Sequence, residues 1–269
     1  MVLSRRWDES DLPGNTIVVT SALPSEGKTT TAINLAAALA TAEQRVLLVD
    51  GDPQGNATSG LGISVQDGES TLYDVLEGSA PSSAIRASVH FPNLDVLPAT
   101  PDLAGAEVEL VGLDRREARL ADALGSLRAD YDYVLIDCPP SLGLLTVNML
   151  AAADGLIIPL QCEYFALEGL TQLLRTVKLV QEALNPGLAI DGVLLTMYDA
   201  RLNLSRQVAE EARKYFGQAV FSTVIPRNIR LAEAPSFGKP IILYDITSVG
   251  AASYMSVAKE FMEREQTYV

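Results

Sequence analysis

The strongest signal in this chain lies at residues 22–29, which read Ala22-Leu23-Pro24-Ser25-Glu26-Gly27-Lys28-Thr29. An apolar run at residues 16–20 precedes this stretch and a helix-like segment at residues 30–39 follows it, which is the context of a phosphate-binding P-loop. The stretch has the P-loop spacing, with Ala22 in place of the first glycine. Backbone N–H groups at a helix start offer positive partial charge to phosphates. Lys28 can reach the outer phosphates and the Thr29 hydroxyl can ligate magnesium, so the stretch predicts a nucleotide site rather than a chance Gly-Lys-Thr.

Short apolar runs alternate with longer helical patterns along the whole chain. We expect strands at residues 16–20, 45–49, 94–97, 133–136, 155–160, 192–197 and 220–225. We expect helices near residues 29–42, 115–129, 143–153, 168–184, 205–216 and 248–265. Continuous apolar strands separated by helices indicate an α/β fold, with a mostly parallel twisted sheet covered by helices on both faces. The division expected is an N-terminal extension at residues 1–15 and a single domain at residues 16–269.

Three carboxylates follow predicted strands. Asp50 and Asp52 come after the apolar run at residues 46–49, and Asp137 ends the apolar run at residues 133–136. Ligands of parallel sheets sit outside the carboxyl ends of the strands, so these residues and the P-loop should converge on one cleft. Phosphoryl transfer needs magnesium and a positioned water. One of Asp50 and Asp52 could orient that water while the other supports the loop, and Asp137 is suited to hold magnesium, often through water.

Composition limits the other function classes. The chain has 269 residues, 48% of them hydrophobic, and a formal charge of −14. No uninterrupted apolar stretch is long enough to cross a membrane, and the N-terminus lacks the apolar core of a signal peptide, so a soluble cytoplasmic protein is expected. Cys138 and Cys162 show no metal-ligand spacing and are expected to be buried, and His90 is expected in a surface loop.

The charge is unevenly distributed. Residues 201–230 contain six basic and two acidic side chains, a net +4, which leaves −18 on the rest of the chain. A basic strip on an acidic body suits a switchable contact with a polyanion. A solvated helix face with its own ion pairs is an equally good reading of the charge alone.

These motifs together resemble the ParA/Soj chromosome-partitioning ATPases, within the ParA/MinD group of deviant Walker P-loop proteins. The resemblance runs from about Thr16 to about Phe261, through residues 27–31, 50–58, 136–141, 161–169 and 225–240. It implies ATP and Mg²⁺ as ligands, with Lys28 and Asp52 serving hydrolysis. The implied metal residues are Thr29, Asp52 and Asp137. The implied nucleotide-binding residues are Glu26, Gly27, Lys28, Thr29, Thr30, Pro226 and Asn228, of which the last two lie in the stretch that faces adenine.

The resemblance also implies partners. It predicts a homodimer in the ATP-bound state, binding of DNA without sequence preference through Arg201, Arg206 and Arg230, a ParB-like partner protein and association with the nucleoid. A membrane-anchored switch of the MinD kind needs a basic amphipathic C-terminal helix, whereas residues 259–265 are net acidic. No membrane partner is expected.

The P-loop departs from the partition pattern. Leu23 stands where those ATPases carry a lysine that reaches across the dimer, and Pro24 and Ser25 replace two glycines. Arg115, Arg116 and Lys178 are guesses for a replacement cation. The loop also resembles that of polysaccharide tyrosine autokinases, which makes phosphorylation of Tyr268 one alternative. The positioning of a protein cargo, such as a carboxysome, on the nucleoid is another.

Overall fold

The computed structural model describes residues 15–141, 143–163 and 166–267. Six parallel strands form one sheet in the order β3-β2-β4-β1-β5-β6. The strands are β1 (Asn15–Val19), β2 (Val46–Asp50), β3 (Leu94–Leu97), β4 (Tyr133–Asp137), β5 (Gly155–Gln161) and β6 (Ala189–Thr196). The chain order reverses across β1, which places the P-loop at the point where ligands of such sheets bind.

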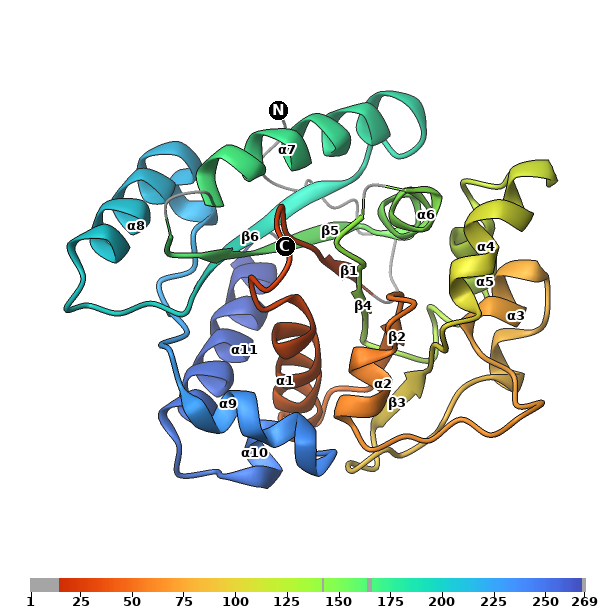
Figure 1. Cartoon of the computed structure of the whole chain (residues 1–269), viewed down its shortest axis with the longest axis horizontal. Helices are drawn as coiled ribbons and strands as arrows, with labels where there is room; N and C mark the ends of the chain where they lie inside the picture. Colours follow the sequence, from red (N-terminus) through yellow and green to blue (C-terminus); the bar gives the residue numbers. More distant parts are fainter. Residues whose placement is uncertain (1–14, 142, 164–165, 268–269) are drawn as a thin grey trace.

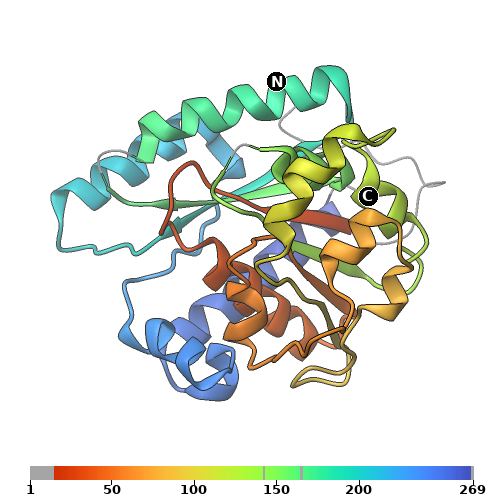
Figure 2. The same ribbon diagram turned by 45° about the vertical axis from the view of Figure 1, so that its right-hand side comes forward.

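Helices cover both faces of the sheet (Figure 1). One face carries α3 (Leu72–Glu77), α4 (Leu103–Glu109), α5 (Arg119–Gly125), α6 (Leu144–Ala152), α7 (Ala166–Ala183) and α8 (Asn203–Phe216). The other carries α1 (Lys28–Thr41), α2 (Asn56–Gly60), α9 (Ile229–Glu233), α10 (Ile241–Tyr244) and α11 (Val249–Thr267). Figure 2 shows the same two layers after a turn of 45°, with α7 and α8 on one side of the sheet and α10 on the other.

Successive side chains along each strand point to opposite faces of the sheet, so each strand contributes to both cores. In β1, Val18 belongs to the core on the side of α3–α8, whereas Ile17 and Val19 belong to the core on the side of α1 and α11. Both sides are fully buried, which explains why the strands read as continuous apolar runs. Polar contacts fix α1 in its layer, since Asn34 Oδ1 accepts from Ile241 N at 2.7 Å and the Thr31 and Tyr254 hydroxyls lie 3.1 Å apart.

The predicted fold class is confirmed, but the prediction of a seventh strand at residues 220–225 is wrong. Residues 220–225 touch β6 only through scattered bonds, such as Phe221 N to Val193 O at 2.9 Å. The Ser222 and Thr223 N–H groups donate instead to the Glu260 carboxylate of α11, at 2.7 and 3.0 Å. A side chain thus takes the place of a neighbouring strand.

The helix predicted at residues 115–129 is also shorter than expected, because Arg115 has a φ of 53° and α5 spans only Arg119–Gly125. A left-handed arginine cannot continue a right-handed helix. The cysteine prediction is confirmed, as Cys138 and Cys162 are both buried. His90 is exposed and its Nε2 lies 2.9 Å from Leu61 O and 2.8 Å from Gly238 O.

Some predictions fall on residues outside the described ranges. These are the N-terminal extension up to residue 14, Tyr164 and Phe165 of one family motif, and Tyr268. Within the described part of the chain, no helix has the length and apolar character needed to span a membrane.

Candidate nucleotide-binding site

The P-loop joins β1 to α1 and is held by its own charged side chains. Gly27 and Ser25 adopt left-handed φ values of 92° and 64°, which turn the chain sharply before the helix. Lys28 Nζ donates to Ser21 Oγ and to Leu23 O, both at 3.1 Å. The buried Glu26 carboxylate accepts from Leu23 N at 2.8 Å. Leu23 is therefore fixed from two sides, by the lysine through its carbonyl and by the glutamate through its amide.

Glu26 points into the protein instead of outward toward solvent. Glu26 is only 1% exposed. Burial raises the pKa of its carboxyl, whereas the hydrogen bond from Leu23 N and the charge of Lys28 act to lower it. Its backbone carbonyl accepts from the Thr196 hydroxyl at 2.8 Å, which ties the loop to the end of β6. Glu26 acts on the P-loop as an internal brace.

Asp50 and Asp52 have different surroundings at the end of β2. Asp50 is fully buried and accepts from Thr58 N and Thr58 Oγ1, each at 2.7 Å, and from Asp52 N at 3.2 Å. Burial raises the pKa of Asp50 to about 6, and the Asp52 charge adds to this while the Thr58 bonds oppose it. Asp50 supports the loop that carries Asp52, whose Oδ1 accepts from Gln54 N at 2.9 Å.

Asp137 lies beside Asp50 in the register of β4 and β2 and is completely buried. Neither of its carboxylate oxygens has a hydrogen-bond partner within the described part of the chain. Burial raises the pKa of Asp137 well above its usual range, the Asp50 and Asp52 charges raise it further, and the Thr29 hydroxyl and Lys28 ammonium oppose the rise. An unpaired buried carboxylate is costly unless a cation can reach it.

A cleft of about 610 Å³ opens at this edge of the sheet. It brings together Gly27, Lys28, Thr29, Thr30 and Asp52 of the predicted site. Asp137 does not line the cleft. Glu26 lines a neighbouring cavity, which shares Pro24 and Met197 with the cleft.

The donors at this edge fit magnesium. Asp137, Asp52 and the Thr29 hydroxyl are hard oxygen donors, and Asp137 has two oxygens without protein partners. No group of three or more His, Cys, Asp or Glu side chains suited to a metal occurs in the ranges that the structure describes. Mg²⁺ usually takes one or two protein carboxylates and completes its coordination shell with waters and substrate phosphates.

Comparison with known proteins identifies the family. The sequence profile of the family described as "AAA domain" matches residues 14–190. The sporulation initiation inhibitor protein Soj of Bacillus subtilis is 59% identical over 247 residues, which cover 92% of this chain and 98% of that protein. The chromosome partitioning protein ParA of Myxococcus xanthus is 58% identical, over 94% of this chain and 89% of that protein. The chain belongs to the ParA/Soj family of chromosome-partitioning ATPases.

A solved structure shows the same architecture around bound nucleotide. The cobyrinic acid a,c-diamide synthase of Mycobacterium smegmatis, solved with bound ADP and magnesium, has a TM-score of 0.82 and 37% identity, over 95% of this chain and 96% of that one. The predicted family and fold are thus confirmed for this ParA/Soj protein.

Pro226 and Asn228, the two residues predicted to face adenine, are not among the residues that line the cleft. Pro226 forms a bridge with Tyr198, the neighbour of Met197, which does line the cleft. Asn228 caps α9, with its Oδ1 accepting from Arg230 N at 2.8 Å.

The basic strip of this ParA/Soj protein is partly neutralised by acids from outside it. Arg201 is 88% exposed yet lies 2.6 Å from Asp199, which lowers the pKa of that carboxyl to about 2. Arg230 lies 2.9 Å from Glu233 and 3.6 Å from Asp245. Arg206 donates to Ala200 O at 3.0 Å and to Asn203 Oδ1, two uncharged acceptors.

Sequence reasoning missed one cation in the cleft. Lys239, which follows the turn at Gly238, lines the cleft together with Lys28. The guessed replacements for the absent lysine lie elsewhere, since Arg115, Arg116 and Lys178 pair with Asp122, Glu117 and Glu182. No local signal marks Lys239, because its place depends on how α9 and α10 fold back over α1.

Proposed function

We propose that this ParA/Soj protein is an ATP-driven switch that partitions chromosomal or plasmid DNA. The observation that carries the proposal is the buried, unpartnered carboxylate of Asp137 beneath the P-loop cleft that Lys28, Thr29 and Asp52 line. Such an arrangement supports a magnesium–triphosphate site. The names of the relatives favour chromosome partition over the alternatives of cargo positioning and tyrosine phosphorylation.

The chain's own residues would divide the work at this site. Backbone N–H groups at the start of α1 and the Lys28 ammonium would bind the phosphates, once Lys28 leaves its acceptors Ser21 and Leu23. Thr29, Asp52 and Asp137 would hold Mg²⁺, which when bound neutralises charge on the phosphates. Asp52, on the loop that Asp50 braces, would orient the attacking water.

The nucleotide would control assembly. ATP would favour a homodimer, and the dimer would present Arg201, Arg206 and Arg230 from both subunits to DNA without sequence preference. Doubling the phosphate contacts raises affinity steeply, while the acidic remainder of the surface repels DNA from the single subunit. Hydrolysis would release the DNA, with a ParB-like partner as regulator, and the protein would work in the cytoplasm on the nucleoid.

DNA binding measured by anisotropy of a labelled duplex tests this switch. We expect tight binding with ATP and Mg²⁺ and weak binding with ADP or without nucleotide. Lys28→Ala should abolish the ATP effect, because the phosphates lose their main cation. Asp52→Ala should bind DNA with ATP but fail to release it, because the water loses its orienting carboxylate. Equal DNA affinity in all three nucleotide conditions would refute the proposal.

A further inference from the structure

Met197, the first residue after β6, has a backbone conformation that is rare for its type. Its φ is 50°, in the left-handed region that residues other than glycine seldom adopt. The other described non-glycine residues with a positive φ are all polar: Ser25, Glu43, Ser88, His90 and Arg115. Backbone strain of this kind gathers at functional sites, where the surrounding structure maintains it.

The residues on both sides of Met197 are fixed by hydrogen bonds. Thr196 Oγ1 donates to Glu26 O of the P-loop at 2.8 Å. Tyr198 N donates to Ile225 O at 3.0 Å. Because these contacts hold the chain before and after it, the strained conformation falls on Met197 itself.

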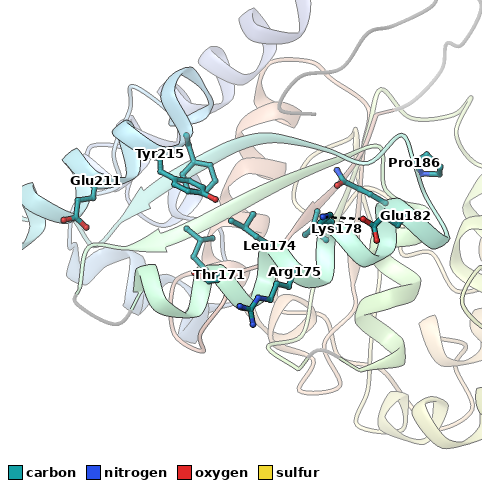
Figure 3. A pocket seen from close by; sticks show the side chains of 12 residues that line it. Thr171, Leu174, Arg175, Lys178, Glu182, Pro186, Glu211 and Tyr215 are labelled. Atoms are coloured by element: carbon teal, nitrogen blue, oxygen red, sulfur yellow. Dashed lines mark ion pairs between the residues drawn. The ribbon is translucent and has the colours of Figure 1, made fainter. Parts of the chain in front are cut away.

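Met197 lies in the wall between two hollows. It lines the nucleotide cleft of about 610 Å³ and also the neighbouring cavity of about 700 Å³, as Pro24 does. The groove of about 690 Å³ between α7 and α8, which Figure 3 shows with Leu174 and Tyr215 in its lining, has no described lining residue in common with either. The space next to the P-loop thus continues past Met197, whereas the groove is separate from it.

The order of the strands sets the direction of a bound nucleotide. Asp52 follows β2 and Met197 follows β6, and these strands lie two positions from β1 on opposite sides. The P-loop after β1 therefore lies between the two residues. The outer phosphate must approach Asp52 for hydrolysis, so the base should extend toward Met197. Pro226, which the family resemblance assigns to adenine, pairs with the adjacent Tyr198.

We propose that Met197 packs its thioether side chain against one face of the nucleotide's base. This inference rests on the nucleotide site of the proposed function and adds a residue to it. A methionine side chain is polarizable, makes favourable contacts with aromatic rings and is only a weak hydrogen-bond acceptor. Met197 therefore holds the base by packing, and its strained backbone keeps the side chain at the cleft.

Calorimetric binding of ATP and of tripolyphosphate, each with Mg²⁺, separates base contacts from phosphate contacts. Met197→Ala should weaken ATP binding about fivefold and leave tripolyphosphate binding unchanged, because only ATP carries a base. Met197→Leu keeps most of the apolar volume and should bind ATP within about twofold of the wild type.

Met197→Gly separates the strain from the contact. Glycine adopts a φ of 50° freely, so this variant should melt at a higher temperature than Met197→Ala while binding ATP equally weakly. Glu43 offers a matched control, because it has a φ of 64°, is exposed beyond the end of α1 and does not line the cleft. Glu43→Gly should likewise melt above Glu43→Ala, and both should keep the ATP affinity of the wild type.

Circular dichroism verifies that each variant is folded, and Met197→Gly keeps the test valid if Met197→Ala is not. Equal weakening of ATP and tripolyphosphate binding would overturn the proposal, because Met197 would then act only through the shape of the P-loop. An unchanged ATP affinity would overturn it too. Both results would leave the phosphate site and the proposed function standing. A wild-type chain that binds neither ligand would instead refute the nucleotide site, and this inference with it.

Discussion

The carboxylates at the ends of β2 and β4, Asp50 and Asp137, lie side by side in the strand register but differ in their hydrogen bonds. Asp50 accepts three hydrogen bonds, whereas Asp137 accepts none from the described residues. Burial of an unsatisfied acid costs stability in the nucleotide-free protein. The site therefore gives up stability in order to keep two oxygens available for a cation.

Substitution of Asp137 should separate stability from activity. Asp137→Asn keeps the shape but removes an acid whose ionisation burial disfavours, so the free energy of unfolding without nucleotide should rise by about 1 kcal/mol or more at pH 7.5. ATP turnover should fall by roughly 100-fold or more as a magnesium ligand is lost. Urea unfolding and a phosphate-release assay measure the two effects. A less stable variant with intact turnover would show that Asp137 is a structural residue only.

The buried acids also predict how stability depends on pH. The folded pKa of Asp50 is about 6 against 3.8 as the unperturbed value, and the pKa values of Asp137 and Glu26 are raised as well. The folded state thus binds more protons than the unfolded state, and stability falls as the pH rises through this window. Asp50 alone accounts for on the order of 3 kcal/mol.

Acids whose pKa values are lowered, such as Asp199, with a pKa of about 2, and Asp132, act in the opposite direction and at lower pH. We therefore expect the nucleotide-free protein to lose stability between pH 4.5 and pH 6.5, which urea titrations at several pH values will measure. Asp137→Asn should have a shallower loss. Stability that increases over this window would mean that the three acids are ionised at little cost.

At the scale of elements, the first turn of α7 packs against the P-loop. A Cβ added to Gly169 would lie 3.0 Å from Ala22 Cβ and 3.1 Å from Leu23 Cγ, which is closer than side chains normally allow. Leu23, at the position of the family's lysine, thus has a packing role on α7. A shift of the first turn of α7 should therefore change the conformation of the P-loop.

Gly169→Ala tests that link. The added methyl group should displace the P-loop by a few tenths of an ångström and weaken ATP binding about fivefold, or roughly 1 kcal/mol, as measured by calorimetry. Gly105→Ala on α4 is the control, since its Cβ would meet nothing closer than Glu109 Oε2 at 3.6 Å. It should raise stability by about 0.5–1 kcal/mol and leave ATP affinity unchanged. Equal ATP affinities of the two variants would disprove the link.

Elements with strong local signals were predictable, and elements decided by distant contacts were not. The strands that carry Asp50 and Asp137 are buried apolar runs, and the P-loop has its own spacing, so both follow from local sequence. Residues 220–225 have the same apolar pattern, but Glu260 from α11 satisfies their N–H groups. The inward position of Glu26 depends on Leu23 and on Thr196 from β6, which no local pattern indicates.

At the scale of the whole molecule, folding changes the meaning of the charge count. Residues 201–230 carry +4 by sequence, yet Asp199, Glu233 and Asp245 lie outside that range and pair with Arg201 and Arg230. Glu163, far away in sequence, pairs with Arg227 at 3.3 Å. A phosphate backbone must compete with these carboxylates, so the basic strip in one subunit is weaker than its sequence suggests.

The salt dependence of DNA binding and the effect of Asp199 follow from this competition. If Arg201, Arg206 and Arg230 of both subunits contact phosphates, the logarithm of affinity should fall with the logarithm of salt concentration at a slope of about −5. Arg201→Ala should reduce the magnitude of this slope by about 2, because each dimer loses two contacts.

Asp199→Asn should tighten ATP-dependent DNA binding severalfold at low salt, because it frees Arg201 from its exposed ion pair. Asp122→Asn is the control, as it removes a carboxylate from Arg115, outside the strip, and should change neither affinity nor slope. A flat response to salt, or identical affinities for Asp199→Asn and the wild type, would mean that Arg201 does not contact DNA by this electrostatic route.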